Sequence, residues 1–129
     1  MWGVTLVTVP TIVFGGLAVL GVISGGLYGI PGPRDLTPMQ TAFYRAGHAH
    51  AGVLLILSLL LQMGLDHVRL ARAWIWPLRV AAPPPAILIP AGFFGAAHAP
   101  ALAVLLYVGG IVLTTVTLAV GIGLIRARA

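Results

Sequence analysis

Residues 2–30 form a run of 29 residues without a single charged side chain. A helix needs about 20 mostly apolar residues to cross the hydrocarbon core of a membrane, so this run is long enough to span it. The whole chain of 129 residues is 60% hydrophobic and 7% charged, whereas soluble domains carry roughly 25% charged residues. A chain this short cannot bury so much apolar surface in an aqueous core. The sequence therefore predicts an integral membrane protein.

The first predicted helix follows Met1 directly, and no basic residue precedes its apolar run. A cleavable signal peptide would need basic residues there and a shorter apolar run, so we expect this helix to stay in the mature protein. Pro10 predicts a kink. Gly21, Gly25 and Gly29 repeat every four residues, which favours one smooth helix face for close packing.

The second helix is predicted to begin at Pro38. Thr37 is a typical N-cap, Pro38 suits the first helical position, and Gln40 completes a capping box. The helix should continue to about Asp66, with residues 46–65 as its apolar part. A basic and aromatic connection, residues 67–79, is expected to follow at the membrane interface.

The third apolar run, residues 80–97, is the weakest of the four. It is only 18 residues long and contains Pro83, Pro84, Pro85 and Pro90. We expect it to span the membrane, and a short, kinked or partly re-entrant element is the alternative.

Pro100 suits the first turn of a fourth helix, and residues 101–125 then supply 25 uncharged residues. The predicted spans are residues 2–30, 46–65, 80–97 and 101–125, in a single transmembrane domain covering residues 1–129. The predicted fold is all-α, with four helices in an up-down antiparallel bundle.

The arginines divide unequally between the two ends of such a bundle. One end carries Arg69, Arg72, Arg79, Arg126 and Arg128, and the other carries Arg34 and Arg45. Since cytoplasmic loops are enriched in basic residues, both termini are expected in the cytoplasm. The aromatic residues give the same two ends, with Trp2, Trp74 and Trp76 at the inner one and Tyr28, Phe43 and Tyr44 at the outer one. The seven arginines are scattered and there is no Lys, so the net charge of +5 does not indicate nucleic-acid binding.

Histidines are the main candidates for chemistry, because the chain has no Cys and only two acidic residues. His48 and His50 at the head of the second helix and His98 just before the fourth share the outer end of the bundle. His67 lies at the opposite end, beside Asp66, and is expected to be solvated. Polar side chains at membrane depth are costly, so His48, His50 and His98 form a candidate site.

The spacing of His48 and His50 limits that site, because the two side chains point about 200° apart on a regular helix. Either they serve two cofactors on opposite faces, or one ligates while the other forms a hydrogen bond, or the helix is irregular. Gly52 lies four residues after His48 and leaves flat space of the kind that a porphyrin needs. Arg45 can pair with a heme propionate or with a lipid phosphate.

The segment Arg45-Ala-Gly-His48-Ala-His50, continuing to Ser58, resembles the His-x-His helix of the catalytic subunits of heme-copper oxidases and nitric oxide reductases. In those families the two histidines ligate two hemes on opposite faces of the helix. The chain also resembles a group of small bacterial four-helix membrane proteins with a later Gly-x-x-His segment, here Gly95-Ala-Ala-His98. The resemblance implies heme or copper ligation by His48, His50 and His98. It does not imply a complete oxygen-reducing or nitric-oxide-reducing centre in one copy.

The first hypothesis is a protein of the bacterial inner membrane that holds heme, or alternatively copper, in the outer leaflet between the second and fourth helices. It would serve electron transfer, gas sensing or cofactor handling, and whether it catalyses a reaction stays open. The second is an accessory subunit of a larger membrane complex, such as a respiratory one, or a homo-oligomer, with histidines that only form hydrogen bonds. The third is an oligomeric channel whose histidines titrate near neutral pH.

Overall fold

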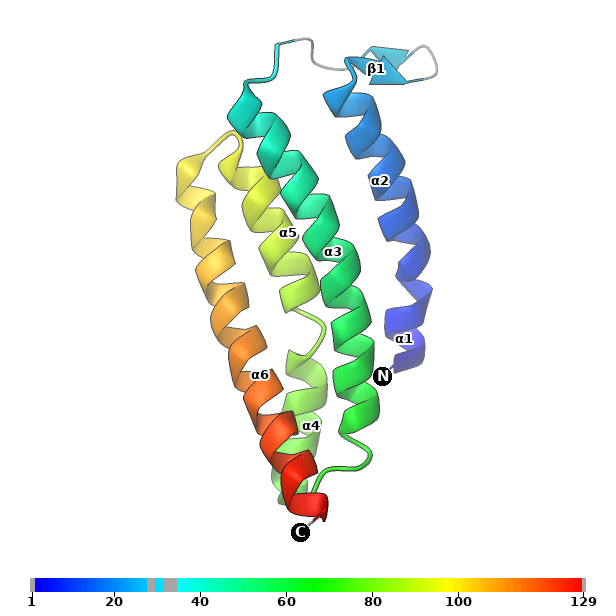
Figure 1. Cartoon of the computed structure of the whole chain (residues 1–129), viewed down its shortest axis with the longest axis vertical. Helices are drawn as coiled ribbons and strands as arrows, with labels where there is room; N and C mark the ends of the chain where they lie inside the picture. Colours follow the sequence, from blue (N-terminus) through cyan, green and yellow to red (C-terminus); the bar gives the residue numbers. More distant parts are fainter. Residues whose placement is uncertain (1, 28–29, 32–34, 129) are drawn as a thin grey trace.

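The computed structural model describes residues 2–27, 30–31 and 35–128, and within these ranges the chain is almost entirely helical (Figure 1). The helices are α1 (Trp2–Val7), α2 (Val9–Ile23), α3 (Pro38–Gly64), α4 (Arg72–Ala81), α5 (Pro85–Ala96), the short 3₁₀ helix η1 (Pro100–Ala103) and α6 (Val104–Arg128). Strands β1 (Gly26–Leu27) and β2 (Ile30–Pro31) form a small antiparallel ribbon. Four segments are long and apolar enough to span a membrane: Gly3–Ile23, Pro38–Gly64, Arg72–Ala96 and Pro100–Arg128.

The first helical segment is broken and shorter than the predicted span of residues 2–30. The break lies at Thr8, between α1 and α2, because Pro10 has no N–H to donate to the carbonyl of Leu6. The helix then ends at Ile23, and Gly25 has the left-handed φ of 75° that commonly ends helices. The predicted glycine face is therefore wrong at Gly25, which lies outside the helix. Gly29, Tyr28 and Arg34 lie outside the described residues.

The start of the second predicted helix is confirmed in detail. The backbone N–H of Gln40 donates to Thr37 Oγ1 over 3.2 Å, and the Thr37 N–H donates to Gln40 Oε1 over 2.9 Å. Pro38 occupies the first turn, where no N–H is needed. The resulting helix, α3, is continuous to Gly64, so the irregular-helix explanation of His48 and His50 is excluded.

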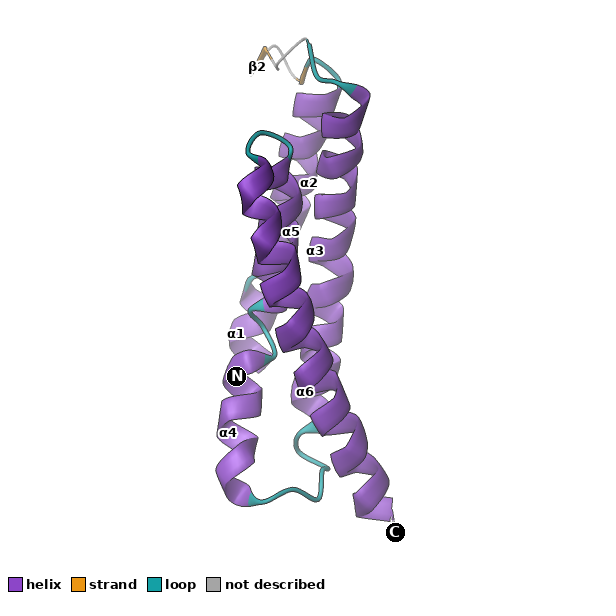
Figure 2. Ribbon diagram, turned by 90° about the vertical axis from the view of Figure 1, so that its left-hand side faces the viewer, coloured by secondary structure: helices purple, strands orange, loops and turns teal. Residues whose placement is uncertain are grey.

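The third segment is longer than the predicted residues 80–97, because it consists of two helices stacked end to end (Figure 2). α4 begins at Arg72, so most of the predicted basic and aromatic connection is helical. α4 continues through Pro77 to Ala81, and the chain breaks at residues 82–84, before Pro85 starts α5. Near the end of α4, Arg79 forms an ion pair with Asp66, and this pair holds α4 beside the end of α3.

Glycines set the close approach of the helices. A Cβ atom on Gly47 of α3 would lie 2.7 Å from Phe94 of α5, and one on Gly109 of α6 would lie 2.6 Å from Ile89 of α5. α3 packs on α1, α2 and α5, while the most extensive contact of α6 is with α5. Small residues let helix backbones pack closely where lipid supplies no hydrophobic driving force.

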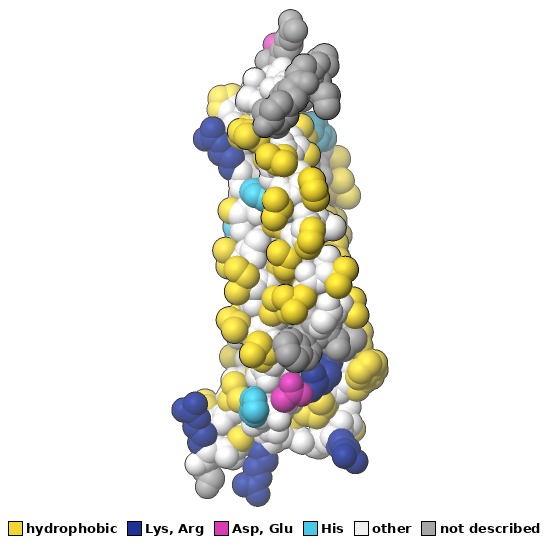
Figure 3. All heavy atoms as spheres, turned by 90° about the vertical axis from the view of Figure 1, so that its right-hand side faces the viewer, with side chains coloured by type: hydrophobic (Ala, Val, Ile, Leu, Met, Phe, Trp, Pro, Cys, Tyr) yellow, Lys and Arg dark blue, Asp and Glu magenta, His cyan; other side chains and the backbone are white. Residues whose placement is uncertain are grey.

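Hydrogen bonds define which helix ends lie together. The Gln40 amide near the start of α3 donates to the Ala97 carbonyl just after α5, over 3.0 Å. At the other end, the Arg69 N–H donates to the Gly123 carbonyl near the end of α6, also over 3.0 Å. Between these two ends, apolar side chains cover the face shown in Figure 3, whereas charged side chains gather near its extremities. This distribution matches an apolar layer between two aqueous phases.

Candidate functional site

His48 lies on the face of α3 that contacts α2. A Cβ atom on Gly16 would lie only 2.8 Å from Cε1 and Nε2 of the His48 imidazole, so the ring rests directly on the α2 backbone. Beside the ring is a cavity of about 190 Å³. It is lined by Thr11, Ile12, Gly15, Val19, His48, Ala51 and Phe94. His48 is therefore a half-buried group between two helices and faces a small, mostly apolar space.

His50 lies on the other side of α3 and packs on α5. Its ring centroid is 4.8 Å from that of Phe93, with an angle of 36° between the planes. Its Nδ1 lies 2.8 Å from the Ala46 carbonyl oxygen. Because a carbonyl can only accept, Nδ1 carries the hydrogen, and Nε2 of the neutral ring keeps its lone pair. The side chain is exposed, so this lone pair is accessible at the surface of the chain.

His98 is exposed in the turn between α5 and η1, where it interacts with the start of α3. Its Nε2 lies 2.9 Å from the hydroxyl oxygen of Tyr44, and this hydrogen bond joins residues 54 positions apart. The Tyr44 ring also packs on Phe94, with centroids 5.6 Å apart. Together with the bond between Gln40 and Ala97, these contacts fasten the end of α5 to α3.

The structure does not bring the three predicted ligands together. His48 faces α2, His50 faces α5, and His98 is held by Tyr44. Within the described ranges, no three His or acidic side chains are grouped so that they could hold a metal ion. The expected position between the second and fourth spans also differs from the contacts found, because at this end α3 packs on α2 and α5 rather than on α6.

The remaining predicted site residues are open to their surroundings. Arg45 is exposed on α3, one residue after Tyr44. Apart from its chain neighbours and the backbone of α3 itself, no described atom lies within 4 Å of the position that a Cβ on Gly52 would take, so the space there is open. At the opposite end of the molecule His67 is exposed beside Asp66, as expected.

Sequence reasoning missed a buried polar cluster near the end of α3. Gln62 is completely buried, and its Nε2 donates to Thr5 Oγ1 on α1 over 2.9 Å and to Ser58 Oγ over 3.4 Å. Gln62 of α3 thus forms an interhelical hydrogen bond, and its partner is Thr5 of α1. The available signal was the spacing of Thr5, Thr8 and Thr11, three polar residues at intervals of three in an apolar helix.

His48, His50 and His98 differ in how well their surroundings suit a cofactor. A single copper ion needs several converging ligands, which the described side chains do not provide. The cavity of about 190 Å³ beside His48 is below the roughly 300–1,000 Å³ of pockets for drug-sized ligands, so a porphyrin does not fit there. His50 is exposed and its Nδ1 is bonded to a carbonyl, which leaves Nε2 as the nitrogen that could hold a heme iron. The chain matches no protein-family description, no curated protein and no solved structure.

Proposed function

We propose that this chain is a multi-pass protein of the bacterial inner membrane, with its four long apolar segments crossing in alternating directions. The hydrogen bond between Arg69 and Gly123 supports this arrangement, because it places the loop after α3 beside the end of α6. Arg72, Arg79, Arg126 and Arg128 belong to helix segments near that end. An arginine-rich end favours the cytoplasmic side, which would hold both termini there.

We further propose that the protein binds heme at the outer end of α3, where His50 would hold the iron. The observation that carries this proposal is the hydrogen bond from His50 Nδ1 to the Ala46 carbonyl. Such a bond to the second ring nitrogen is the usual companion of a metal-ligating histidine, because it sets the tautomer and raises the basicity of the ligating nitrogen. The ring is also steadied by Phe93, so its orientation is prepared before any ligand arrives.

A bound heme would supply one-electron transfer or gas binding at its iron. The protein residues would supply the rest of the site. Phe93 and the apolar surface of α3 and α5 would exclude water from one side of the porphyrin. Arg45 is exposed five residues before His50 on α3, and it can pair with a propionate or with a lipid phosphate.

His50 is exposed, so this chain would cover a heme bound there on one side only. A second surface must cover the other side. We therefore propose that a second copy or a partner membrane subunit completes this site. Ile56 and Val53, which follow His50 along α3, are both large exposed apolar residues. Such residues can face either lipid or another helix.

The direct test is a visible absorption spectrum of detergent-purified protein, oxidised and then reduced with dithionite, together with iron and copper analysis. Heme binding predicts a Soret band, sharp reduced bands and stoichiometric iron. Copper without a Soret band would instead favour a histidine copper site completed by another chain. A featureless spectrum without metal would contradict both.

An accessory subunit without a cofactor is the second candidate. The specific observation in its favour is the exposure of the first segment, because Thr5 is the one residue of Gly3–Ile23 that is buried within the described chain. A helix of this kind has most of its surface left for lipid or for partner helices. This candidate predicts that cross-linking in native membranes gives a defined complex with other chains, whereas the cofactor analysis stays negative.

A further inference from the structure

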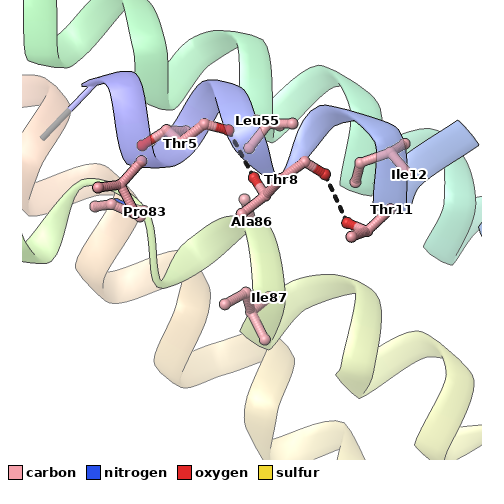
Figure 4. Close-up of a pocket in the computed structure, with 9 residues that line it drawn as sticks. Thr5, Thr8, Thr11, Ile12, Leu55, Pro83, Ala86 and Ile87 are labelled. Carbon is pink, nitrogen blue, oxygen red and sulfur yellow. Dashed lines mark hydrogen bonds between the residues drawn. The ribbon is translucent and has the colours of Figure 1, made fainter.

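A groove of about 330 Å³ lies where two broken helical segments face each other (Figure 4). One wall is the broken segment α1–α2, with Thr5, Thr8 and Thr11 along it. The opposite wall is the break before α5, with Pro83, Ala86 and Ile87. Leu55 of α3 also lines the groove, so three of the four long apolar segments contribute to it.

The threonines do not make this groove polar. The Thr8 hydroxyl donates to the Thr5 carbonyl over 2.7 Å, and the Thr11 hydroxyl donates to the Thr8 carbonyl over 2.6 Å. Figure 4 shows both bonds running along the helix rather than across the groove. Since these hydroxyl hydrogens are used within the helix, the groove offers mainly methyl and methylene groups to an occupant.

The groove opens at the apolar surface of the molecule. Val4 and Ile87 lie on its two walls, and each is 69% exposed. Both residues belong to segments proposed to cross the membrane, so the opening would face the lipid interior. Molecules that dissolve in lipid would therefore meet it at high local concentration.

The other end of the groove adjoins the cavity beside His48. Thr11 and Ile12 line both spaces, and the second space ends on the His48 imidazole, with Gly15, Ala51 and Phe94 around it. This second space, called the inner cavity below, holds about 190 Å³ and, like the groove, is partly open to its surroundings rather than enclosed. An engineered apolar cavity of about 150 Å³ in another protein stays dry and takes up benzene or xenon, so this volume suits occupants of that size.

We propose that small, neutral, apolar molecules enter from the lipid side through this groove and bind beside the imidazole of His48. The class includes dissolved gases and single-ring hydrocarbons, and it excludes ions and large polar solutes. The binding site is distinct from the heme site proposed at His50, and it does not depend on a cofactor. Its test therefore uses cofactor-free protein and has a readout of its own.

The experiment is NMR of protein labelled at its four histidines, in lipid nanodiscs, under increasing xenon pressure. We expect the ring signals of His48 to shift in a saturable manner. His50, His67 and His98 serve as internal controls, because none of them lines the groove or the inner cavity. Equal shifts at all four histidines, or a linear response at His48, would overturn the proposal.

Two variants test the route. Gly15→Leu places a side chain into the inner cavity, where no described atom lies within 4 Å of the Cβ position, and should abolish the His48 response. Thr8→Phe fills the groove and should also abolish it or slow it. Gly110→Leu is the matched control, since Gly110 is equally open but lies on α6, away from the route.

A variant is interpreted only when its thermal unfolding and its backbone NMR spectrum match those of the wild type. If Gly15→Leu or Thr8→Phe fails this criterion, the smaller replacements Gly15→Val and Thr8→Leu are used instead. An unchanged His48 response in a folded Gly15 variant would show that xenon does not bind in the inner cavity. An unchanged response in a folded Thr8 variant would show that the groove is not the entrance. Either result contradicts the proposal and leaves the heme site at His50 untouched.

Discussion

The imidazole of His48 on α3 rests on Gly16 of α2, so close that a Cβ atom on Gly16 would lie 2.8 Å from two atoms of the ring. This contact directs His48 toward the first helical segment and away from His98. It also explains why three histidines at one end of the chain do not form one centre. Because Gly16 has no side chain, α2 leaves room for the imidazole that α3 directs toward it.

Gly16→Ala should displace the His48 ring and destabilise the packing of α2 on α3. The added methyl group overlaps the imidazole, and overpacking of this kind costs about 1–3 kcal/mol. The free energy of unfolding, measured by steric trapping in bicelles, should fall by that amount, with a shift of the His48 NMR signals. Gly15→Ala is the control, because its Cβ position is open and Ala is the better helix former. Equal effects of the two substitutions would disprove the contact.

Thr5 and Gln62 should be energetically coupled. Thr5→Val removes the acceptor of a fully buried amide, so the free energy of unfolding should fall by about 1–3 kcal/mol. In a Gln62→Leu background the same substitution should cost about 1 kcal/mol less, as found for other hydrogen bonds between membrane helices.

The control for this cycle is Thr11→Val, because the Thr11 hydroxyl bonds only to its own helix and the side chain is exposed. This substitution should show no coupling to Gln62. Strict additivity of Thr5→Val and Gln62→Leu would mean that the bond does not form in the membrane.

Tyr44→Phe should release His98 without unfolding the protein. The substitution removes the hydroxyl that bonds to His98 Nε2, at a site that is partly open to solvent. The ¹⁵N signals of His98 should therefore move toward those of a hydrated imidazole, and stability should fall by no more than about 1 kcal/mol. Tyr107→Phe, at an exposed position on α6, should leave the His98 signals where they are. If both substitutions had the same effect, the hydrogen bond would be absent in solution.

The proposed orientation can be tested by cysteine labelling, because the chain has no native Cys. A membrane-impermeant maleimide applied to intact spheroplasts should label Met39→Cys and Ala99→Cys. It should label Ala73→Cys and Ala127→Cys only after lysis. All four positions are exposed in the structure.

Ile111→Cys gives the matching test of insertion. Ile111 of α6 is 68% exposed, and a thiol there should stay unlabelled because lipid covers it. The reverse labelling pattern at positions 39, 73, 99 and 127 would contradict the proposed orientation. Rapid labelling at position 111 in native membranes would contradict the proposal that α6 crosses the membrane.

Local signals in the sequence predicted those features that depend on residues a few positions apart. The capping box of Thr37 and Gln40 is one example, because all of its partners lie within one helical turn. The opposite orientation of His48 and His50 is another, since it follows from the geometry of one continuous helix. The break near Pro10 likewise follows from a missing N–H.

Features that depend on tertiary contacts could not be predicted in this way. The sequence predicts an interfacial connection at Arg72 and Trp74, whereas the structure has a helix there. This helix packs beside α3 and α6 and is held by the pair of Arg79 with Asp66, and neither contact is visible in the local sequence. The apolar run of residues 24–30 looked helical, although Gly25 ends the helix through a left-handed backbone. The neighbours of His48 depend on Gly16, which no pattern within α3 could reveal.

The most direct measurement for the central proposal is a comparison of His50→Ala with His98→Ala. Both substitutions remove an exposed imidazole from the same end of the molecule, but only His50 has its Nδ1 bonded to a carbonyl and its Nε2 lone pair accessible. Reduced-minus-oxidised absorption spectra and iron content of the two purified variants should differ. The account predicts loss of the heme bands in His50→Ala and wild-type bands in His98→Ala, whereas full heme content in His50→Ala would contradict it.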